Sequence, residues 1–184
     1  MARLYYGHIK TNGARIQYYR TGDEKPSVVF LHGFADNGLC WSRIAFKLEP
    51  FYDVIMVDSR AHGLSESTEN GYTPEDRAAD IAGLIQDLNL KNPPIVGHSM
   101  GAASALYTAA FFPKLVGSLI LEDPPFYANP EKESNEVRAK RAEKFLVRIS
   151  DLKGKSHADL VTLGRTENPG WDETDLFQWA KAKQ

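Results

Sequence analysis

The segment Gly97-His98-Ser99-Met100-Gly101 constrains the fold more than any other part of the chain. The apolar run Pro94-Ile95-Val96 precedes it, and the small residues Ala102 to Ala105 follow it. This pattern predicts a buried strand, a tight turn and then a helix, with glycines giving the backbone room to turn. The turn aims the Ser99 hydroxyl outward at the N-terminus of the helix, where negative charge is favoured. Ser99 is therefore the candidate catalytic nucleophile.

Short apolar runs alternate with longer amphipathic stretches along most of the chain, which predicts an α/β fold with a mostly parallel sheet and crossover helices. Leu4–Ile9 and Arg15–Tyr19 flank an Asn-Gly turn and predict an N-terminal antiparallel hairpin. A helix is expected after Thr73, with an apolar stripe at helical spacing. The further strands are expected at Ser27–Leu31, Tyr52–Val57, Pro94–Gly97 and Leu115–Leu121.

His32-Gly33-Phe34 directly follows the apolar run that ends at Leu31. Acyl transfer places negative charge on a carbonyl oxygen, and backbone N–H groups must stabilise that charge. The amides of Phe34 and Met100 are the candidates for this oxyanion hole. We expect His32 to be structural and to brace neighbouring loops.

Three motifs follow one another along the chain: His32-Gly33-Phe34 with Trp41 behind it, then Asp58-Ser59-Arg60-Ala61-His62-Gly63, and then the turn at Ser99. Together and in this order they resemble the α/β-hydrolase superfamily. The resemblance covers about residues 5–127 and is to the esterase, C–C hydrolase and cofactor-free haloperoxidase branch. It implies that Asp58 and Arg60 hold loops together without doing chemistry. Ala61 stands where the family usually has glycine, which predicts slight strain in this loop. A serine at position 99 is unlike the aspartate of epoxide hydrolases and haloalkane dehalogenases in this superfamily.

The resemblance divides the chain into the N-terminal part of a hydrolase core, 1–127, and a helical cap or lid region, 128–184. Residues 131–148 are highly charged, and helices are also expected at 156–163 and 172–183. The family's last two strand–helix units, with the catalytic histidine, are absent from this pattern, so the chain resembles a C-terminally truncated hydrolase. His157 is a weak candidate for the base. The remaining histidines are expected to be structural: His8, His32, His62 and His98.

Asp123 ends the predicted sixth strand, where a minority of relatives keep the acid of the catalytic triad. The alternative is that this proline-flanked carboxylate only shapes the exit loop. Trp41, Phe126 and Tyr127 are candidates to line an acyl pocket, although Trp41 fits ordinary packing equally well.

Composition narrows the possible partners. The formal net charge is −2, with basic and acidic residues mixed, so no basic face for nucleic acid is expected. The single cysteine, Cys40, cannot form an internal disulfide, which favours a cytoplasmic setting. We expect no membrane span, no metal and no cofactor. An open sheet edge after the sixth strand would allow self-association or pairing with a complementing C-terminal segment.

Two functions remain open from the sequence. The first is a serine hydrolase that forms an acyl-enzyme on Ser99 from an ester, thioester, lactone or activated C–C bond of a small molecule. The second is a catalytically inert fragment or pseudo-hydrolase that binds a ligand or serves in assembly. The 184 residues alone are expected to be nearly inactive, because a serine is a weak nucleophile without a histidine.

Overall fold

The protein is described here by a computed structural model that covers residues 4–22, 24–125 and 134–184. The chain forms two compact units, Met1–Pro125 and Phe126–Gln184. The first contains the sheet with its flanking helices, and the second contains helices.

The first unit is built on a six-stranded sheet with the order β1-β2-β4-β3-β5-β6. The β3–β4, β3–β5 and β5–β6 pairs are parallel, whereas β1–β2 and β2–β4 are antiparallel. This confirms the expected α/β-hydrolase arrangement, a mostly parallel sheet with an N-terminal hairpin. The strands are β1 Tyr5–Thr11, β2 Ala14–Arg20, β3 Ser27–Leu31, β4 Asp53–Val57, β5 Ile95–His98 and β6 Leu119–Glu122.

The hairpin turn follows the chemistry of its two residues. Asn12 and Gly13 have φ values of 45° and 74°, and Thr11 pairs with Ala14 across them. Two consecutive residues with positive φ match the right-handed twist of the flanking strands, which is why Asn-Gly is favoured there.

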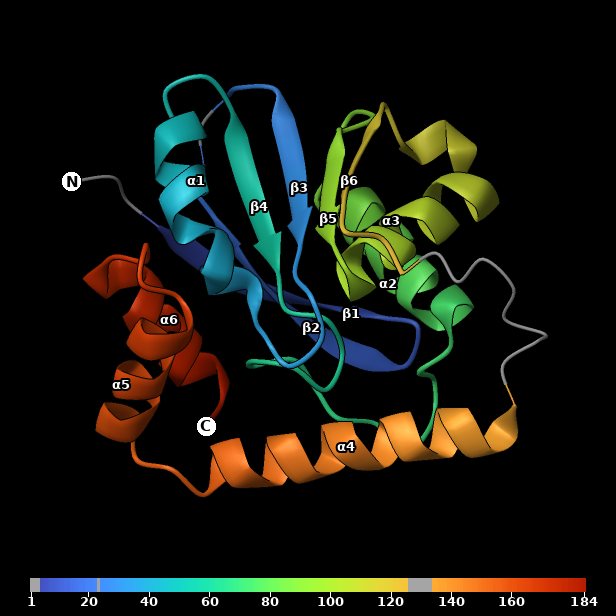
Figure 1. Ribbon diagram of the computed structural model, residues 1–184. Coiled ribbons are helices and arrows are strands. Elements are labelled where there is room, and N and C mark those ends of the chain that lie inside the picture. The colour runs from blue at the N-terminus through green and yellow to red at the C-terminus, as the bar shows by residue number, and fades with distance from the viewer. Residues whose placement is uncertain (1–3, 23, 126–133) are drawn as a thin grey trace. The chain divides into compact units, whose positions relative to one another are not determined.

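Helices cover both faces of the sheet, as Figure 1 shows. One face carries α2 (Pro74–Asp87) and α3 (Met100–Phe111), and Ile81, Leu84 and Ala105 pack there against alternate residues of the strands. The other face carries α1 (Ser42–Leu48), which follows the short 3-10 helix η1 (Gly38–Trp41). Because both faces are covered, all five residues of β4 are buried, which agrees with the continuous apolar run Val54–Val57 after Asp53.

Helix α2 begins where the sequence predicts. The Thr73 hydroxyl accepts from the Asp76 N–H, the Asp76 carboxylate accepts from the Thr73 N–H, and Pro74 takes the first helical position. These contacts satisfy N–H groups that have no partner inside the helix. The expected apolar stripe is buried at Ala78, Ile81, Leu84 and Ile85 and partly buried at Leu88.

The sixth strand is shorter than the sequence predicts. Residues Pro113–Leu115 form a second 3-10 helix, η2, so β6 starts at Leu119 rather than at Leu115. Proline favours such a turn because its fixed φ suits the first helical position and it needs no N–H partner there. β6 is the last strand in the order of the described sheet, and Ile120 is 59% exposed.

The second unit contains α4 (Asn135–Lys153), α5 (His157–Glu167) and α6 (Glu173–Ala182). Ser156 with Asp159, and Asp172 with Asp175, form capping boxes at the starts of α5 and α6. Leu152, Leu160 and Ala180 form a small buried cluster in this unit. Among the described residues, no helix combines the length and apolar character needed to cross a bilayer.

Candidate active site

Ser99 occupies the turn between β5 and α3. Its backbone lies in an unusual region, with φ 50° and ψ −112°, and its N–H donates to the carbonyl oxygen of Glu122 at 2.9 Å. Such a conformation costs a non-glycine residue roughly 1–3 kcal/mol and persists only where the surroundings enforce it. The side chain is half-buried. The structure thus places Ser99 in the strained strand-to-helix turn that the sequence predicts.

The two flanking glycines are required by close backbone approach. A Cβ atom on Gly97 would lie 2.4 Å from the carbonyl oxygen of Gly101. A Cβ atom on Gly101 would lie 2.2 Å from the carbonyl oxygen of Leu31, at the end of β3. Both distances are far below van der Waals contact, so the first turn of α3 packs directly on the backbone of the neighbouring strand.

The loop after β3 passes beside Ser99. A Cβ atom on Gly33 would lie 3.5 Å from the Cβ of Ser99 and 2.7 Å from Nδ1 of His98. Phe34 follows Gly33, and Met100 is the first residue of α3. The two predicted oxyanion residues therefore belong to segments that meet at Ser99. That their amides stabilise an oxyanion stays a prediction.

His32 joins two loops. Its ring is fully buried, its Nε2 accepts from the Ser59 N–H at 3.0 Å, and its Nδ1 lies 2.7 Å from the carbonyl oxygen of Gly33. Because Nε2 accepts, the ring proton sits on Nδ1 and is donated to the carbonyl, which fixes the neutral tautomer. These contacts give His32 the bracing role expected from the sequence.

Asp58 ties three segments together at the end of β4. Its carboxylate accepts from the Gly38 N–H at 2.7 Å, the Leu64 N–H at 2.8 Å and the Tyr19 hydroxyl at 3.1 Å. Burial raises the pKa of Asp58, and these hydrogen bonds oppose that shift by stabilising the charged form. The pKa of Tyr19 is raised as well, chiefly by its burial and then by the Asp58 charge.

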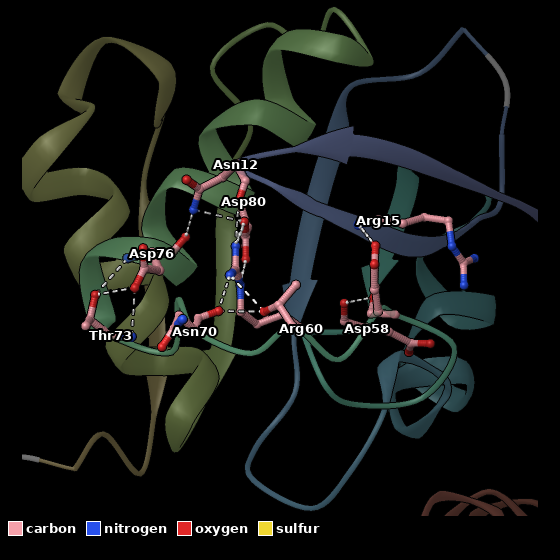
Figure 2. Close-up of polar contacts among 11 residues, drawn as sticks. Asn12, Arg15, Asp58, Arg60, Asn70, Thr73, Asp76 and Asp80 are labelled. Carbon is pink, nitrogen blue, oxygen red and sulfur yellow. Dashed lines mark hydrogen bonds and ion pairs between the residues drawn. The ribbon is translucent and has the colours of Figure 1, made fainter.

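Arg60 forms the second tie, shown in Figure 2. Its guanidinium donates to both carboxylate oxygens of Asp80 in α2, at 2.6 and 2.7 Å, and the two side chains are almost fully buried. Arg60 also donates to the backbone oxygens of Asn12 and Asn70. A bidentate pair of this kind fixes orientation as well as position. Arg60 thus links the β1–β2 turn, helix α2 and the loop after β4.

Ala61 carries the strain that the sequence suggests. Its φ is 59°, and the His62 N–H donates to the Ser59 carbonyl at 2.9 Å, so Ala61 is the third residue of a four-residue turn. Turns with a positive φ at this position prefer glycine. The next residue, His62, packs its ring 5.1 Å from the His32 ring and 5.7 Å from the Phe34 ring, measured between centroids.

The remaining predicted site residues are distributed differently. Asp123 is exposed and follows β6, whose last residue Glu122 pairs with His98, so Ser99 and Asp123 leave neighbouring strands at the same end of the sheet. Trp41 is 7% exposed and packs on Phe30 in the core beside α1. Of the two roles expected for Trp41, the structure shows packing in the core. A contact between Trp41 and a substrate stays a prediction. Phe126 and Tyr127 lie outside the described residues.

The weak base candidate His157 lies in the second unit. It is the first residue of α5, and its ring packs edge-on against Phe177 at 4.9 Å. The exposed His8 lies on β1. His98 lies beside Gly33.

Sequence reasoning missed Asp80, Tyr19 and the ring contacts of His62. Asp80 had a signal, because a carboxylate between Ala78 and Ile81 on a buried helix face requires a cationic partner. Tyr19 and His62 had no such signal, because their partners lie far away in the sequence.

A family model described as the alpha/beta hydrolase fold matches residues 26–148, which include β3, the Asp58 loop, the turn at Ser99 and β6. The chain belongs to the α/β-hydrolase family. The match confirms the resemblance inferred from the three motifs, and the named relatives below are hydrolases or a thioesterase.

A 2-(acetamidomethylene)succinate hydrolase from Mesorhizobium japonicum is 39% identical over 106 residues, which is 58% of this chain and 38% of that protein. An N-formylmaleamate deformylase from Pseudomonas putida is 32% identical over 120 residues, or 65% and 45% of the two chains. The thioesterase domain from the curacin biosynthetic pathway superimposes with a TM-score of 0.77 at 27% identity, covering 98% of this chain and 66% of that domain. The chain thus spans less than half the length of these two curated relatives.

Proposed function

We propose that this chain carries the nucleophile and the oxyanion hole of a serine hydrolase acting on a small molecule. The observation that carries the proposal is the strained Ser99 turn, with the Gly33 to Phe34 loop beside it. A protein that used Ser99 only as a turn residue would gain stability from glycine at this position. The expected substrates contain an ester, a thioester, a lactone or an activated C–C bond. The names of the two curated relatives add N-acyl derivatives of dicarboxylic acids to this group.

In the proposed reaction, Ser99 Oγ attacks the carbonyl carbon of the substrate as its proton passes to a base. Negative charge develops on the carbonyl oxygen, and the N–H groups of Phe34 and Met100 donate to it. Loss of one such donor typically costs ~3 kcal/mol of transition-state stabilisation. The leaving group departs, and water then hydrolyses the acyl-enzyme by the same route.

The proton relay needs a histidine and an acid. Asp123 is the proposed acid, since it leaves β6 beside Ser99. We assign the base to none of the five histidines. We propose instead that it comes from sequence corresponding to the part of the relatives beyond the matched residues. Removing the histidine of a serine triad costs about a million-fold in rate, so the 184 residues alone should turn over substrate extremely slowly.

The test is covalent labelling by a fluorophosphonate. It is carried out in parallel on the protein as its source produces it and on the 184-residue chain. Intact mass and peptide mapping show how many adducts form and on which residue. We expect one adduct on Ser99 in the naturally produced protein. The adduct should be lost in Ser99→Ala and retained in Ser67→Ala, a matched control at an exposed serine outside the turn.

Labelling that persists in Ser99→Ala would contradict the proposal. If neither protein is labelled but a small ligand binds with equal affinity to wild type and Ser99→Ala, the binding-module alternative replaces it.

A further inference from the structure

The ring of His62 connects the loop after β4 to the loop that carries the proposed oxyanion donor. It lies between two other rings, with centroid distances of 5.1 Å to His32 and 5.7 Å to Phe34. His32 is fully buried and bound through both of its nitrogens, so one end of this row of rings is fixed. Phe34 at the other end is 52% exposed, and the His62 ring is one of the contacts on its buried side.

His62 is itself held from several directions. Its Nδ1 lies 3.0 Å from the carbonyl oxygen of Arg60, its N–H donates to the Ser59 carbonyl, and its carbonyl accepts from the Ser65 N–H. Because a carbonyl oxygen only accepts, Nδ1 carries the proton in this contact. Ser59 is the same residue that donates its N–H to His32. These hydrogen bonds fix the backbone of the strained turn at Ala61, and the His62 ring is attached directly after it.

We propose that His62 is a positioning residue, whose ring holds Phe34 so that the Phe34 N–H stays aimed at the developing oxyanion beside Ser99. This inference rests on the proposed function for its chemical consequence, because Phe34 is there the oxyanion donor. The physical reason is preorganisation: a donor stabilises the transition state most when it needs no reorientation during the reaction.

Two substitutions distinguish the effect of the His62 ring from the effect of its hydrogen bond to the Arg60 carbonyl. His62→Asn removes the ring but keeps a side-chain donor for the Arg60 carbonyl, whereas His62→Phe keeps an aromatic ring and removes the donor. His8→Asn, at an exposed histidine of β1, is the matched control. The first measurement is the NMR order parameter of the Phe34 amide in each protein.

We expect an order parameter of about 0.85 for Phe34 in wild type, His62→Phe and His8→Asn, and a value below about 0.6 in His62→Asn. An unchanged order parameter in His62→Asn would overturn the inference. An equal loss in both His62 variants would overturn it too, because the hydrogen bond rather than the ring would then hold the loop.

The second measurement is the rate of Ser99 labelling by the fluorophosphonate in the naturally produced protein. We expect about a tenfold fall in His62→Asn, less than the effect of losing an oxyanion donor outright, and a near wild-type rate in His62→Phe. Equal rates in wild type and His62→Asn, with a mobile Phe34, would show that the ring does not serve the reaction. If wild-type Ser99 is not labelled at all, the proposed function fails, and the order parameters still decide whether His62 positions Phe34.

Discussion

Among the described non-glycine residues with positive φ, Ser99 and Ala61 lie in turns that are held in this conformation by different means. At Ser99 the constraint comes from the backbone, because Gly97 and Gly101 allow main-chain atoms to approach more closely than any side chain would permit. At Ala61 the constraint comes from side chains, since Asp58 and Arg60 fix the loop through hydrogen bonds to β2, η1, α2 and the β1–β2 turn.

The strain at Ser99 serves the proposed chemistry, whereas the strain at Ala61 does not. The proposed reaction needs the Ser99 hydroxyl, so a glycine that relieved the strain would remove the proposed nucleophile. Ala61 is exposed and contributes only a methyl group, so its strain can be relieved without losing a contact. The four predictions below test how far each turn depends on its own kind of constraint.

The largest expected change in unfolding free energy comes from removing the ion pair that helps to fix the Ala61 turn. Arg60→Met leaves the buried Asp80 carboxylate without its cation, and breaking a buried pair in this way typically costs about 3–5 kcal/mol of unfolding free energy. Urea denaturation measures the change. The double variant Arg60→Met/Asp80→Leu should recover most of the loss, and a double variant as unstable as the single one would show that the ion pair is not the source.

The next largest change in unfolding free energy is expected where close backbone approach fixes the turn at Ser99. Gly101→Ala places a Cβ 2.2 Å from the Leu31 carbonyl oxygen, and overpacking of this kind costs about 3 kcal/mol. Gly170→Ala is the control, because no atom lies within 4 Å of the added Cβ. Equal midpoints for the two variants in denaturation would mean that α3 can move away from β3 freely.

A smaller change, of opposite sign, is expected at Ala61. Ala61→Gly removes the cost of a left-handed alanine, about 1–2 kcal/mol, against the greater flexibility of glycine in the unfolded chain. The net expected result is a gain of about 0.5–1 kcal/mol in unfolding free energy. A loss of stability in this variant would contradict the assignment of strain to this turn.

The smallest effect concerns pH. Burial lowers the pKa of His62, an effect that the Arg77 charge adds to, while its hydrogen bond to the Arg60 carbonyl and the charges of Asp58 and Asp36 oppose it. Below the ordinary value of 6.5 the unfolded chain takes up a proton at this position before the folded chain does. Stability therefore falls as pH is lowered from 7 to 5. Denaturation at both pH values should show a smaller fall in His62→Phe, and identical falls would exclude His62 as the cause.

Local sequence signals predicted the fold well where the structure depends on local contacts. Thr73-Pro74 with Asp76 begins a helix, and Asn12-Gly13 closes a hairpin, because each set of residues satisfies its own backbone. The predicted start of β6 was wrong, because Leu115 and Val116 continue the apolar pattern while the backbone at Pro113 turns into a short helix.

Long-range pairs in the site could not be predicted in the same way. Tyr19 and Asp58 are 39 residues apart, and Arg60 and Asp80 are 20 apart. Their contacts depend on how strands and helices assemble rather than on local spacing. The turn at Ser99 could be located from five residues, whereas a relay of acid and base requires side chains brought together from several elements.

The strand order has a consequence for synthesis on the ribosome. β1 and β2 are neighbours in sequence and can pair as soon as they emerge, but β3 lies between β4 and β5, both of which are made later. The apolar segment Ser27–Leu31 therefore has both edges unpaired until β4 has left the exit tunnel, and one edge stays unpaired until β5 has left it too. During that interval it is the part of the nascent chain most in need of a chaperone, because unpaired apolar strands invite association.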